Sequence, residues 1–289
     1  MNDTIIFLSQ KGSYAKFFES NSNIEIKYIY KPNVNRNSFF FRLIRKYLLK
    51  LQFIFYNKYE RDYNIKKIII FDDGINKCVT RYIKKIYPNA KIILYCWNNV
   101  DDYLLNQSKN KDFDDVWSFN IYDCNKYNFK YNPQFYFDRK YKKTKPKIDI
   151  LFVGRDKGRE EVITTFLNNI KDLNLNNKIM IIKEEKDLID YSIYLDYVHK
   201  SNIILDIVIS HDFGLTLRVL ESIFYEKKLI TNNKNITNYD FYDKNNIFII
   251  GLDSFDEFKK FITTPYKKID KKIINNYKFE SWLNRFNGG

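Results

Sequence analysis

Short runs of β-branched and aromatic residues alternate along the chain with longer stretches whose apolar positions recur at helical spacing. In the first half, such runs predict strands over residues 4–9, 24–30, 66–73, 91–97 and 115–120. Helical spacing predicts helices between them, over residues 38–58, 75–86 and 101–109. Because strands and helices alternate, this half is predicted to form an α/β unit with a parallel sheet.

A second alternation follows a predicted linker. The run DRKYKKTKPK, residues 138–147, is charged, contains proline and has no apolar face. After it, strands are predicted over residues 148–155, 178–183, 202–209, 227–233 and 246–251, and helices over residues 160–173, 187–200, 215–226 and 254–263. Nearly continuous apolar strands separated by helices indicate sheets covered on both faces. We therefore expect two tandem doubly wound, Rossmann-like α/β domains, with ligands in an interdomain cleft beyond the carboxyl ends of the strands.

Composition supports a folded protein. The chain has 289 residues, of which 45% are hydrophobic and 18% aromatic, so it can bury the cores of two domains. It has only 8 Gly and 5 Pro, which argues against a disordered or fibrous chain. The formal net charge of +14 indicates an anionic partner, which could be nucleic acid, a membrane surface or a phosphorylated small molecule. The charge could also follow only from a lysine-rich composition that keeps the protein in solution.

The cysteines and the apolar runs bear on location. Cys78, Cys96 and Cys124 are odd in number and widely spaced, so neither a disulfide framework nor a zinc site is predicted. The run TIIFLS, residues 4–9, is too short for a signal peptide, and no segment approaches the roughly 20 apolar residues that span a bilayer. We expect a cytoplasmic protein that is not integral to a membrane.

A glycine stands before the helix predicted from about residue 215, in the stretch HDFGLTLRVLES. Gly214 would let a ligand approach backbone N–H groups that have no partner within the helix, where the helix dipole favours negative charge. Helical spacing puts Arg218 and Glu221 one turn apart, on the face opposite the leucines. The stretch therefore predicts a phosphate site. The alternative is that Gly214 is only a turn residue and the two charged residues are a surface ion pair.

A second basic cluster lies in FVGRDKGRE, residues 152–160. Arg155, Lys157 and Arg159 surround Gly154 and Gly158 in a predicted strand-to-helix loop. Fixed cations in such a loop can stabilise a diphosphate leaving group without a metal. The alternative is a solvated basic turn.

These segments resemble a known family. GLTLRVLES, followed by KKLITNN and preceded by IILDI, resembles the donor-binding segment of GT-B nucleotide-sugar glycosyltransferases, in particular those of bacterial lipopolysaccharide-core and surface-polysaccharide biosynthesis. The similarity runs through most of the C-terminal half and, more loosely, through YCWNNV, VWSFNIYDCNKY and FESWL.

The resemblance implies an architecture and an activity. Residues 1–140 would form an acceptor-binding domain, residues 148–265 a nucleotide-sugar donor domain, and residues 266–289 a crossover segment that packs back on the first domain. The enzyme would move a sugar from a nucleotide-sugar to a lipid-linked, lipopolysaccharide or capsule acceptor. It would need no cofactor and no metal.

The resemblance also implies site residues. Glu221 would hold the ribose hydroxyls, and Arg155 with Lys157 would grip the diphosphate. The full expected donor site comprises Gly154, Arg155, Lys157, Arg159, His211, Gly214, Leu215, Thr216, Arg218 and Glu221. Retaining members of the wider group carry a second glutamate eight positions upstream, where this chain has Phe213, so the E-x7-E motif is incomplete and His211 or Asp212 would have to replace it.

Candidate bases for the acceptor hydroxyl follow two predicted strands of the first half. FDDG and NNVDD supply Asp72, Asp73 and Asp101, with Asp102 beside them. Helix caps and turns select the same residue type, so that interpretation stays open, as does a paired-aspartate metal site. His199 and His211 are the only histidines, which are too few for a metal cluster.

Three further features have two interpretations each. Asp206, inside an apolar strand, needs a partner, which would be a loop backbone or a ligand. Tyr194 would pack in the core or flank the nucleotide base. Residues 39–59 mix apolar residues with Arg42, Arg45, Lys46 and Lys50, so they predict either a basic amphipathic helix on an anionic membrane or an ordinary packed helix.

The function predicted from these patterns is a cytoplasmic glycosyltransferase that makes peripheral contact with the inner face of the cytoplasmic membrane. One alternative is a non-catalytic glycan-assembly partner with the same fold. A basic nucleic-acid binder is a further alternative, but the sequence has no recognisable nucleic-acid-binding motif, so no nucleic-acid partner is expected.

Overall fold

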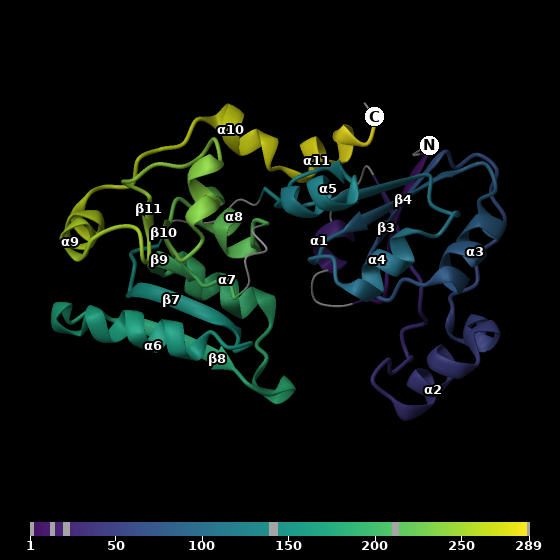
Figure 1. Ribbon diagram of the computed structural model, residues 1–289, viewed down its shortest axis with the longest axis horizontal. Coiled ribbons are helices and arrows are strands. Elements are labelled where there is room, and N and C mark those ends of the chain that lie inside the picture. Colours follow the sequence, from purple (N-terminus) through teal and green to yellow (C-terminus); the bar gives the residue numbers. More distant parts are fainter. Residues whose placement is uncertain (1–2, 12–14, 20–23, 139–143, 210–213, 288–289) are drawn as a thin grey trace. The chain divides into compact units, whose positions relative to one another are not determined.

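The chain folds into two compact units, Met1–Asn132 and Pro133–Gly289, in a computed structural model that describes residues 3–11, 15–19, 24–138, 144–209 and 214–287. Each unit contains one parallel sheet with helices connecting its strands (Figure 1). The prediction of two doubly wound α/β units is confirmed. The boundary between the units lies at Asn132 and Pro133, ahead of the run predicted as a linker.

The first unit has a six-stranded sheet in the order β2-β1-β3-β4-β5-β6, with every paired neighbour parallel. Its strands are β1 (Thr4–Leu8), β2 (Glu25–Tyr28), β3 (Lys67–Phe71), β4 (Lys91–Cys96), β5 (Asp115–Ser118) and β6 (Lys130–Tyr131). Its helices are α1 (Ala15–Glu19), α2 (Phe39–Tyr47), the 3-10 helix η1 (Leu49–Phe55), α3 (Lys77–Ile86), α4 (Asp102–Ser108) and α5 (Ile121–Tyr127).

Strand side chains alternate between the two faces of this sheet. Ile68 and Ile70 of β3 belong to the core cluster that includes Val79 and Ile83 of α3. Phe71 points to the other face, where its ring lies 5.5 Å from that of Phe18 in α1. Both faces are therefore covered, as near-continuous apolar strands require.

The second unit has a five-stranded parallel sheet in the order β11-β10-β9-β7-β8. Its strands are β7 (Ile148–Arg155), β8 (Asn177–Ile182), β9 (Ser201–Asp206), β10 (Lys228–Thr231) and β11 (Ile247–Ile249). Its helices are α6 (Glu160–Asn169), η2 (Lys171–Leu173), η3 (Glu185–Asp187), α7 (Tyr191–His199), α8 (Leu217–Phe224), η4 (Lys234–Asn238), α9 (Phe255–Thr263), α10 (Lys271–Asn276) and α11 (Phe279–Arg285).

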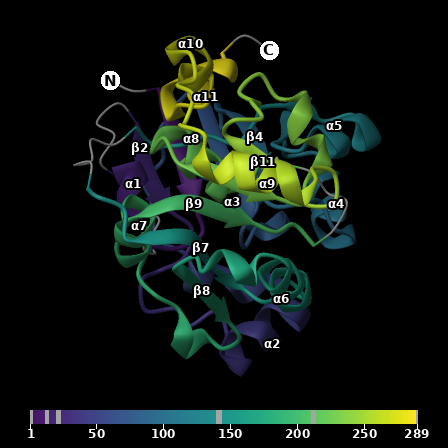
Figure 2. The same cartoon turned by 90° about the vertical axis from the view of Figure 1, so that its left-hand side faces the viewer.

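Helices cover this sheet on both faces. One core cluster joins Leu151 and Ile204 of the strands to residues of α7 and α8. A second cluster joins Ile150 and Phe152 to residues of α6 and α9. Figures 1 and 2 both show α6 beside β7 and β8. Neighbouring strand residues thus face different helices, as a doubly wound sheet requires.

Each sheet contains one point where the strand order reverses. In the first sheet, β1 lies between β2 and β3, and in the second, β7 lies between β8 and β9. In open α/β sheets, ligands bind beyond the carboxyl ends of the strands at such a switch point. The topology therefore directs attention to the chain after β1 and β3, and after β7 and β9.

The helix predicted over residues 38–58 is interrupted. Helix α2 ends at Tyr47, Leu48 leaves helical geometry with φ −124° and ψ 48°, and the chain continues as the 3-10 helix η1. Apolar residues occupy almost every position from Leu48 to Phe55, so the pattern carries no periodicity that would fix the end of the α-helix. The short helices α1 and α5 were not predicted, whereas α10 and α11 lie in residues 266–289, for which a C-terminal crossover helix was predicted.

The C-terminal helices belong to the second unit, where they pair with its first residues. Tyr136 and Lys278 form a parallel bridge, and the Phe135 and Trp282 ring centroids lie 4.4 Å apart. All three cysteines are free. In the described part of the chain, helices are too short or too polar to cross a bilayer.

Candidate functional site

Three segments far apart in the sequence meet at the switch point of the second sheet. Asp206 ends β9, Gly154 lies next to the end of β7, and Arg218 lies in the first turn of α8. Nε of Arg218 lies 2.8 Å from Oδ1 of Asp206. A Cβ atom placed on Gly154 would lie 3.2 Å from Cζ of Phe152 and 3.3 Å from Nη1 of Arg218, so a larger residue there would require these side chains to shift. Gly154 and Arg218, which belong to two separate predicted clusters in the sequence, therefore lie close together in the structure.

The expectation that Asp206 has a partner is confirmed, although the partner is a guanidinium rather than a loop backbone. The Asp206 side chain is 1% exposed and that of Arg218 is 16% exposed. The guanidinium also lies over the ring of Phe152, 5.5 Å from its centroid. Oδ2 of Asp206 has no hydrogen-bond partner among the described residues.

The loop after β7 is a tight turn that presents cations. Lys157 and Gly158 both have positive φ, 47° and 86°, and the Arg159 N–H donates to the Asp156 carbonyl over 2.8 Å. Positive φ at two successive positions is the geometry of a type I′ turn, which costs little at Gly158 but some strain at Lys157. Arg155 and Lys157 are both exposed.

Arg159 has a different environment from its two neighbours. Its Nε donates to the Ile207 carbonyl over 2.7 Å, and its Nη1 donates to the Arg155 carbonyl over 2.7 Å. Arg159 therefore links the chain after β7 to the chain after β9, and two of its guanidinium nitrogens donate to backbone carbonyls.

Helix α8 begins at Leu217 and is capped by Thr216, whose hydroxyl accepts from the Val219 N–H over 3.4 Å. Gly214 and Leu215 are buried just before it. The predicted site residue His211, with its neighbours Asp212 and Phe213, lies outside the described residues.

The alternative of a surface ion pair between Arg218 and Glu221 is wrong, because Arg218 pairs with Asp206 and Glu221 is buried. Its side chain is 1% exposed, and its Oε1 accepts from the hydroxyl of Tyr191 over 2.6 Å. Its Oε2 accepts from the hydroxyl of Tyr194. The Tyr136 hydroxyl lies 3.0 Å from that of Tyr191 and donates to Tyr225 over 3.2 Å. Tyrosine hydroxyls, rather than water, therefore cover this face of the helix.

Burial of its carboxylate limits which ligands Glu221 can contact. Burial raises its pKa, and the hydrogen bonds from Tyr191 and Tyr194 oppose that rise. A ribose could reach the carboxylate only after these tyrosines moved. Tyr194, predicted either in the core or beside a nucleotide base, is 6% exposed and buried.

The three predicted aspartates of the first unit occupy different environments. Asp72 follows β3, is 8% exposed, and accepts from the backbone N–H of Asn98 over 2.9 Å and from its side-chain amide over 3.1 Å. Burial raises the pKa of Asp72 to about 6, against the opposing effect of the Asn98 hydrogen bonds. Asp72 is therefore a carboxyl group poised to exchange a proton near neutral pH.

Asp73 and Asp101 are engaged in other ways. Asp73 accepts two hydrogen bonds from Arg36, over 2.8 and 2.6 Å, and one from Ser9, which follows β1. Although burial acts to raise the pKa of Asp73, these hydrogen bonds hold it below its usual value. Asp101 is the N-cap of α4 and accepts from the Leu104 N–H over 2.7 Å.

Several residues of these sites were not found from the sequence. Arg36 and Tyr136 lie in segments that carried no motif, and Asn98 lies in NNVDD, where only the aspartates were singled out. Tyr191 had a usable signal, because it stands three positions before Tyr194 and so shares a face of α7 with it.

Residues 39–55 present apolar side chains to solvent. Phe39 is 75% exposed, Tyr47 66%, Phe53 61% and Phe40 58%, with Leu48, Leu51, Ile54 and Leu43 between 37% and 47%. A contiguous exposed apolar surface of this kind marks a site of contact with a partner or a membrane. The segment therefore both packs on the core, through Phe41 and Ile44, and presents apolar side chains to solvent.

Within the described ranges, His, Cys, Asp and Glu side chains form no group of three or more that could hold a metal ion.

Comparison with known proteins gives structural matches only. Neither a protein-family model nor a curated protein sequence matches the chain. Among solved structures, TarM matches with a TM-score of 0.49 and 14% identity, over 85% of this chain and 57% of TarM, so the chain spans little more than half of that protein. An alpha1,3-fucosyltransferase solved with GDP matches with a TM-score of 0.46 and 12% identity, over 98% of this chain and 88% of the enzyme. At these values the function has to be argued from the residues of the chain itself.

Proposed function

We propose that the protein is a glycosyltransferase whose second unit binds a nucleotide-sugar donor and whose first unit binds a glycan or glycolipid acceptor. One observation carries the proposal: the switch point of the second sheet gathers Gly154, Asp206 and Arg218, next to the exposed cations Arg155 and Lys157. A parallel α/β sheet binds its ligand at this place, and these cations suit a diphosphate.

The donor chemistry follows from charge. Arg155 and Lys157 form no ion pair with an acid in the described part of the chain, so both are free to meet an anion. When the bond between the sugar and the diphosphate breaks, negative charge grows on the diphosphate, and these cations would stabilise it without a metal ion. The inferred contact of Glu221 with the ribose requires Tyr191 and Tyr194 to move off its carboxylate.

The acceptor chemistry assigns Asp72 as general base. The acceptor hydroxyl oxygen forms a bond to the anomeric carbon, and the bond to the diphosphate breaks with its electron pair on the diphosphate. The hydroxyl proton passes to the Asp72 carboxylate. A pKa of about 6 leaves this carboxylate largely ionised at pH 7 and still basic enough to accept the proton.

The acceptor class and location are part of the same proposal. The apolar surface of α2 and η1 lies among lysines and arginines, a combination that suits the interface of an anionic membrane. We infer peripheral contact with the inner face of the cytoplasmic membrane and an acceptor carried by a lipid, as in lipopolysaccharide or capsule assembly.

The test combines donor binding with turnover. Purified protein is screened against nucleotide sugars of each common base by thermal unfolding, and the donor that raises the midpoint is followed for release or transfer of its sugar with and without EDTA. We expect one donor to stabilise the protein and to be turned over in EDTA. Stabilisation without sugar release would identify a non-catalytic partner, and no shift with any donor would refute the proposal.

A further inference from the structure

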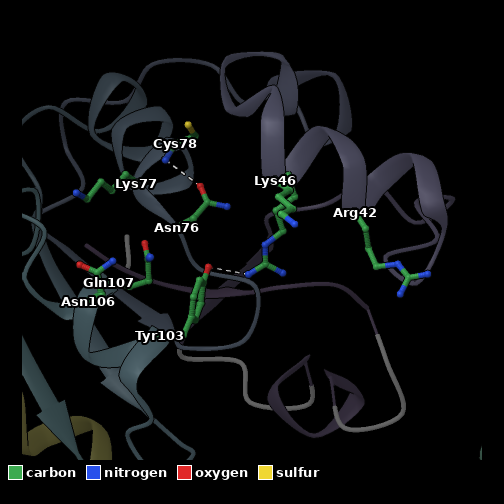
Figure 3. A pocket seen from close by; sticks show the side chains of 9 residues that line it. Arg42, Lys46, Asn76, Lys77, Cys78, Tyr103, Asn106 and Gln107 are labelled. Carbon is green, nitrogen blue, oxygen red and sulfur yellow. Dashed lines mark hydrogen bonds between the residues drawn. The ribbon is translucent and has the colours of Figure 1, made fainter.

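A cavity of about 500 Å³ lies within the first unit. Its lining comes from α2, from the start of α3 and from α4 (Figure 3). The lining residues are Arg42, Arg45, Lys46, Asn76, Lys77, Cys78, Tyr103, Asn106 and Gln107. The volume is within the range of small-molecule sites, which is roughly 300–1,000 Å³.

The lining of the cavity is cationic, although Asp73, which is not part of the lining, lies close enough to Arg45 to interact with its charge. Four of its lining residues are Lys or Arg, and none is Asp or Glu. In the part of the chain that the structure describes, no ion pair joins Arg42, Arg45, Lys46 or Lys77 to an acid. Arg45 instead donates to the neutral hydroxyl of Tyr103 over 2.8 Å. The lining cations carry like charge and the lining holds no acid, so the cavity favours an anion over a cation.

The start of α3 adds to this preference. Asn76 caps the helix by accepting from the Cys78 N–H over 2.8 Å, and Lys77 is its first residue. The N-terminus of this ten-residue helix contributes partial positive charge to the same wall of the cavity. Figure 3 shows Lys77 and Asn76 on one segment and Lys46 on another.

Helix α2 connects the cavity to an apolar surface. Phe41 and Ile44 of this helix are buried in the core. Phe39, Leu43 and Tyr47 stand four positions apart, so they form a separate stripe, and all three are exposed. Arg42, Arg45 and Lys46 occupy the remaining sector, which lines the cavity. The cationic lining is therefore flanked along the helix by side chains suited to a lipid interface.

The segment that contains α2 and η1 is strongly basic, which also favours contact with an anionic surface. Residues 26–59 contain eight lysines and arginines and no aspartate or glutamate. A segment of this composition is attracted to anionic lipid, at roughly 1 kcal/mol for each cation near the surface.

We propose that this cavity binds the phosphate or diphosphate head group of an anionic lipid, while the exposed apolar residues of α2 and η1 lie in the membrane interface. The inference rests on the membrane contact proposed above and names the chemistry of the lipid. It does not depend on the transfer reaction, so a failed transferase assay leaves it intact.

The test is co-sedimentation of the full chain with phosphatidylcholine vesicles that contain equal amounts of either phosphatidic acid, a phosphate monoester, or phosphatidylglycerol, a diester. We expect tighter binding to phosphatidic acid, and displacement from it by pyrophosphate. Lys77→Gln should weaken binding to phosphatidic acid about 5- to 10-fold, which is the scale of one charge-assisted contact, and should reduce the preference over phosphatidylglycerol. Lys85→Gln removes an exposed charge from the last turn of the same helix, outside the cavity, and should bind as the parent.

A second variant separates the membrane contact from the cavity. Phe39→Ser with Phe40→Ser should weaken binding to both vesicle types alike and leave pyrophosphate binding in solution unchanged. Equal effects of Lys77→Gln and Lys85→Gln, or equal binding of the parent to the two lipids, would overturn the proposal. Pyrophosphate binding in solution that Lys77→Gln weakens, without any vesicle binding, would overturn the lipid as the source of the phosphate.

Discussion

Removing Arg218 should strongly destabilise the protein. Asp206 is 1% exposed, its Oδ1 has Arg218 as its ionic partner, and its Oδ2 has no hydrogen-bond partner among the described residues. Arg218→Met would leave this buried carboxylate without its ion-pair partner, although the charge of Arg159 still acts on it, a change that typically costs about 3–5 kcal/mol. The guanidinium keeps 16% exposure, so we expect the lower end, about 3 kcal/mol. For a unit of this size that lowers the unfolding midpoint by roughly 6–12 °C.

The assay is thermal and urea unfolding of four proteins: the parent, each single variant and the double variant Asp206→Asn with Arg218→Met. Because the double variant removes both charges of the pair, we expect it to recover part of the loss; the recovery is incomplete because Arg218 also offsets the charge of the buried Glu221. The matched control is Lys200→Met. Nζ of Lys200 lies 2.5 Å from Oδ2 of Asp196, so this ion pair is at least as short as that of Arg218 with Asp206. Its two side chains, however, are 38% and 52% exposed.

An exposed pair of this kind contributes less than about 1 kcal/mol. A stabilising role for the buried ion pair would be refuted if Arg218→Met lowered the unfolding free energy no more than Lys200→Met, or if the double variant were as unstable as Arg218→Met alone.

Two further predictions concern the proposed site. Because the base must be ionised, kcat/KM should rise with pH up to about 6 and level off above it, and Asp72→Asn should lower it at least about 100-fold and remove the step. The raised pKa also means that the Asp72 carboxyl binds more protons in the folded state than in the unfolded chain between pH 3.8 and about 6, so the unfolding free energy of the parent relative to that of Asp72→Asn should fall by about 3 kcal/mol across that window. Tyr191→Phe frees one oxygen of Glu221 and should tighten donor binding if that carboxylate meets the ribose; calorimetric titration that shows unchanged or weaker binding would assign Glu221 to structure alone.

The parallel sheets could be predicted from the sequence because their strands are short apolar runs between helices with clear periodicity. Runs such as IIIF and IILYC have little alternative to a buried strand. The strand order could not be predicted, since it depends on which edges meet. It is this order that places Gly154 and Asp206 at one switch point.

The environment of Glu221 shows where helical periodicity stops being informative. The spacing correctly separated the polar side of α8 from its leucine side. It could not show that the polar side meets Tyr191 and Tyr194, which lie 30 and 27 positions away. A polar helix face that hydrogen-bonds to tyrosine hydroxyls and one that is exposed to water show the same pattern of polar residues in the sequence.

The environments of the three candidate aspartates also could not be predicted from the sequence. Each follows or precedes a predicted element in the same way, yet one is a buried acid, one is paired with Arg36 and one is a helix cap. Burial and partners, which are set by tertiary contacts, separate Asp72 from Asp73 and Asp101.

In the proposed function, the carboxyl end of the second sheet holds a nucleotide diphosphate through cations of the turn after β7. Calorimetric titration of the parent, Lys157→Ala and Lys171→Ala with the nucleoside diphosphate of the stabilising donor tests it most directly. Lys171 is an exposed cation of the same unit in η2, away from that turn. We expect Lys157→Ala to bind about 10- to 100-fold more weakly and Lys171→Ala to bind as the parent does. Equal affinity of all three proteins would contradict the account.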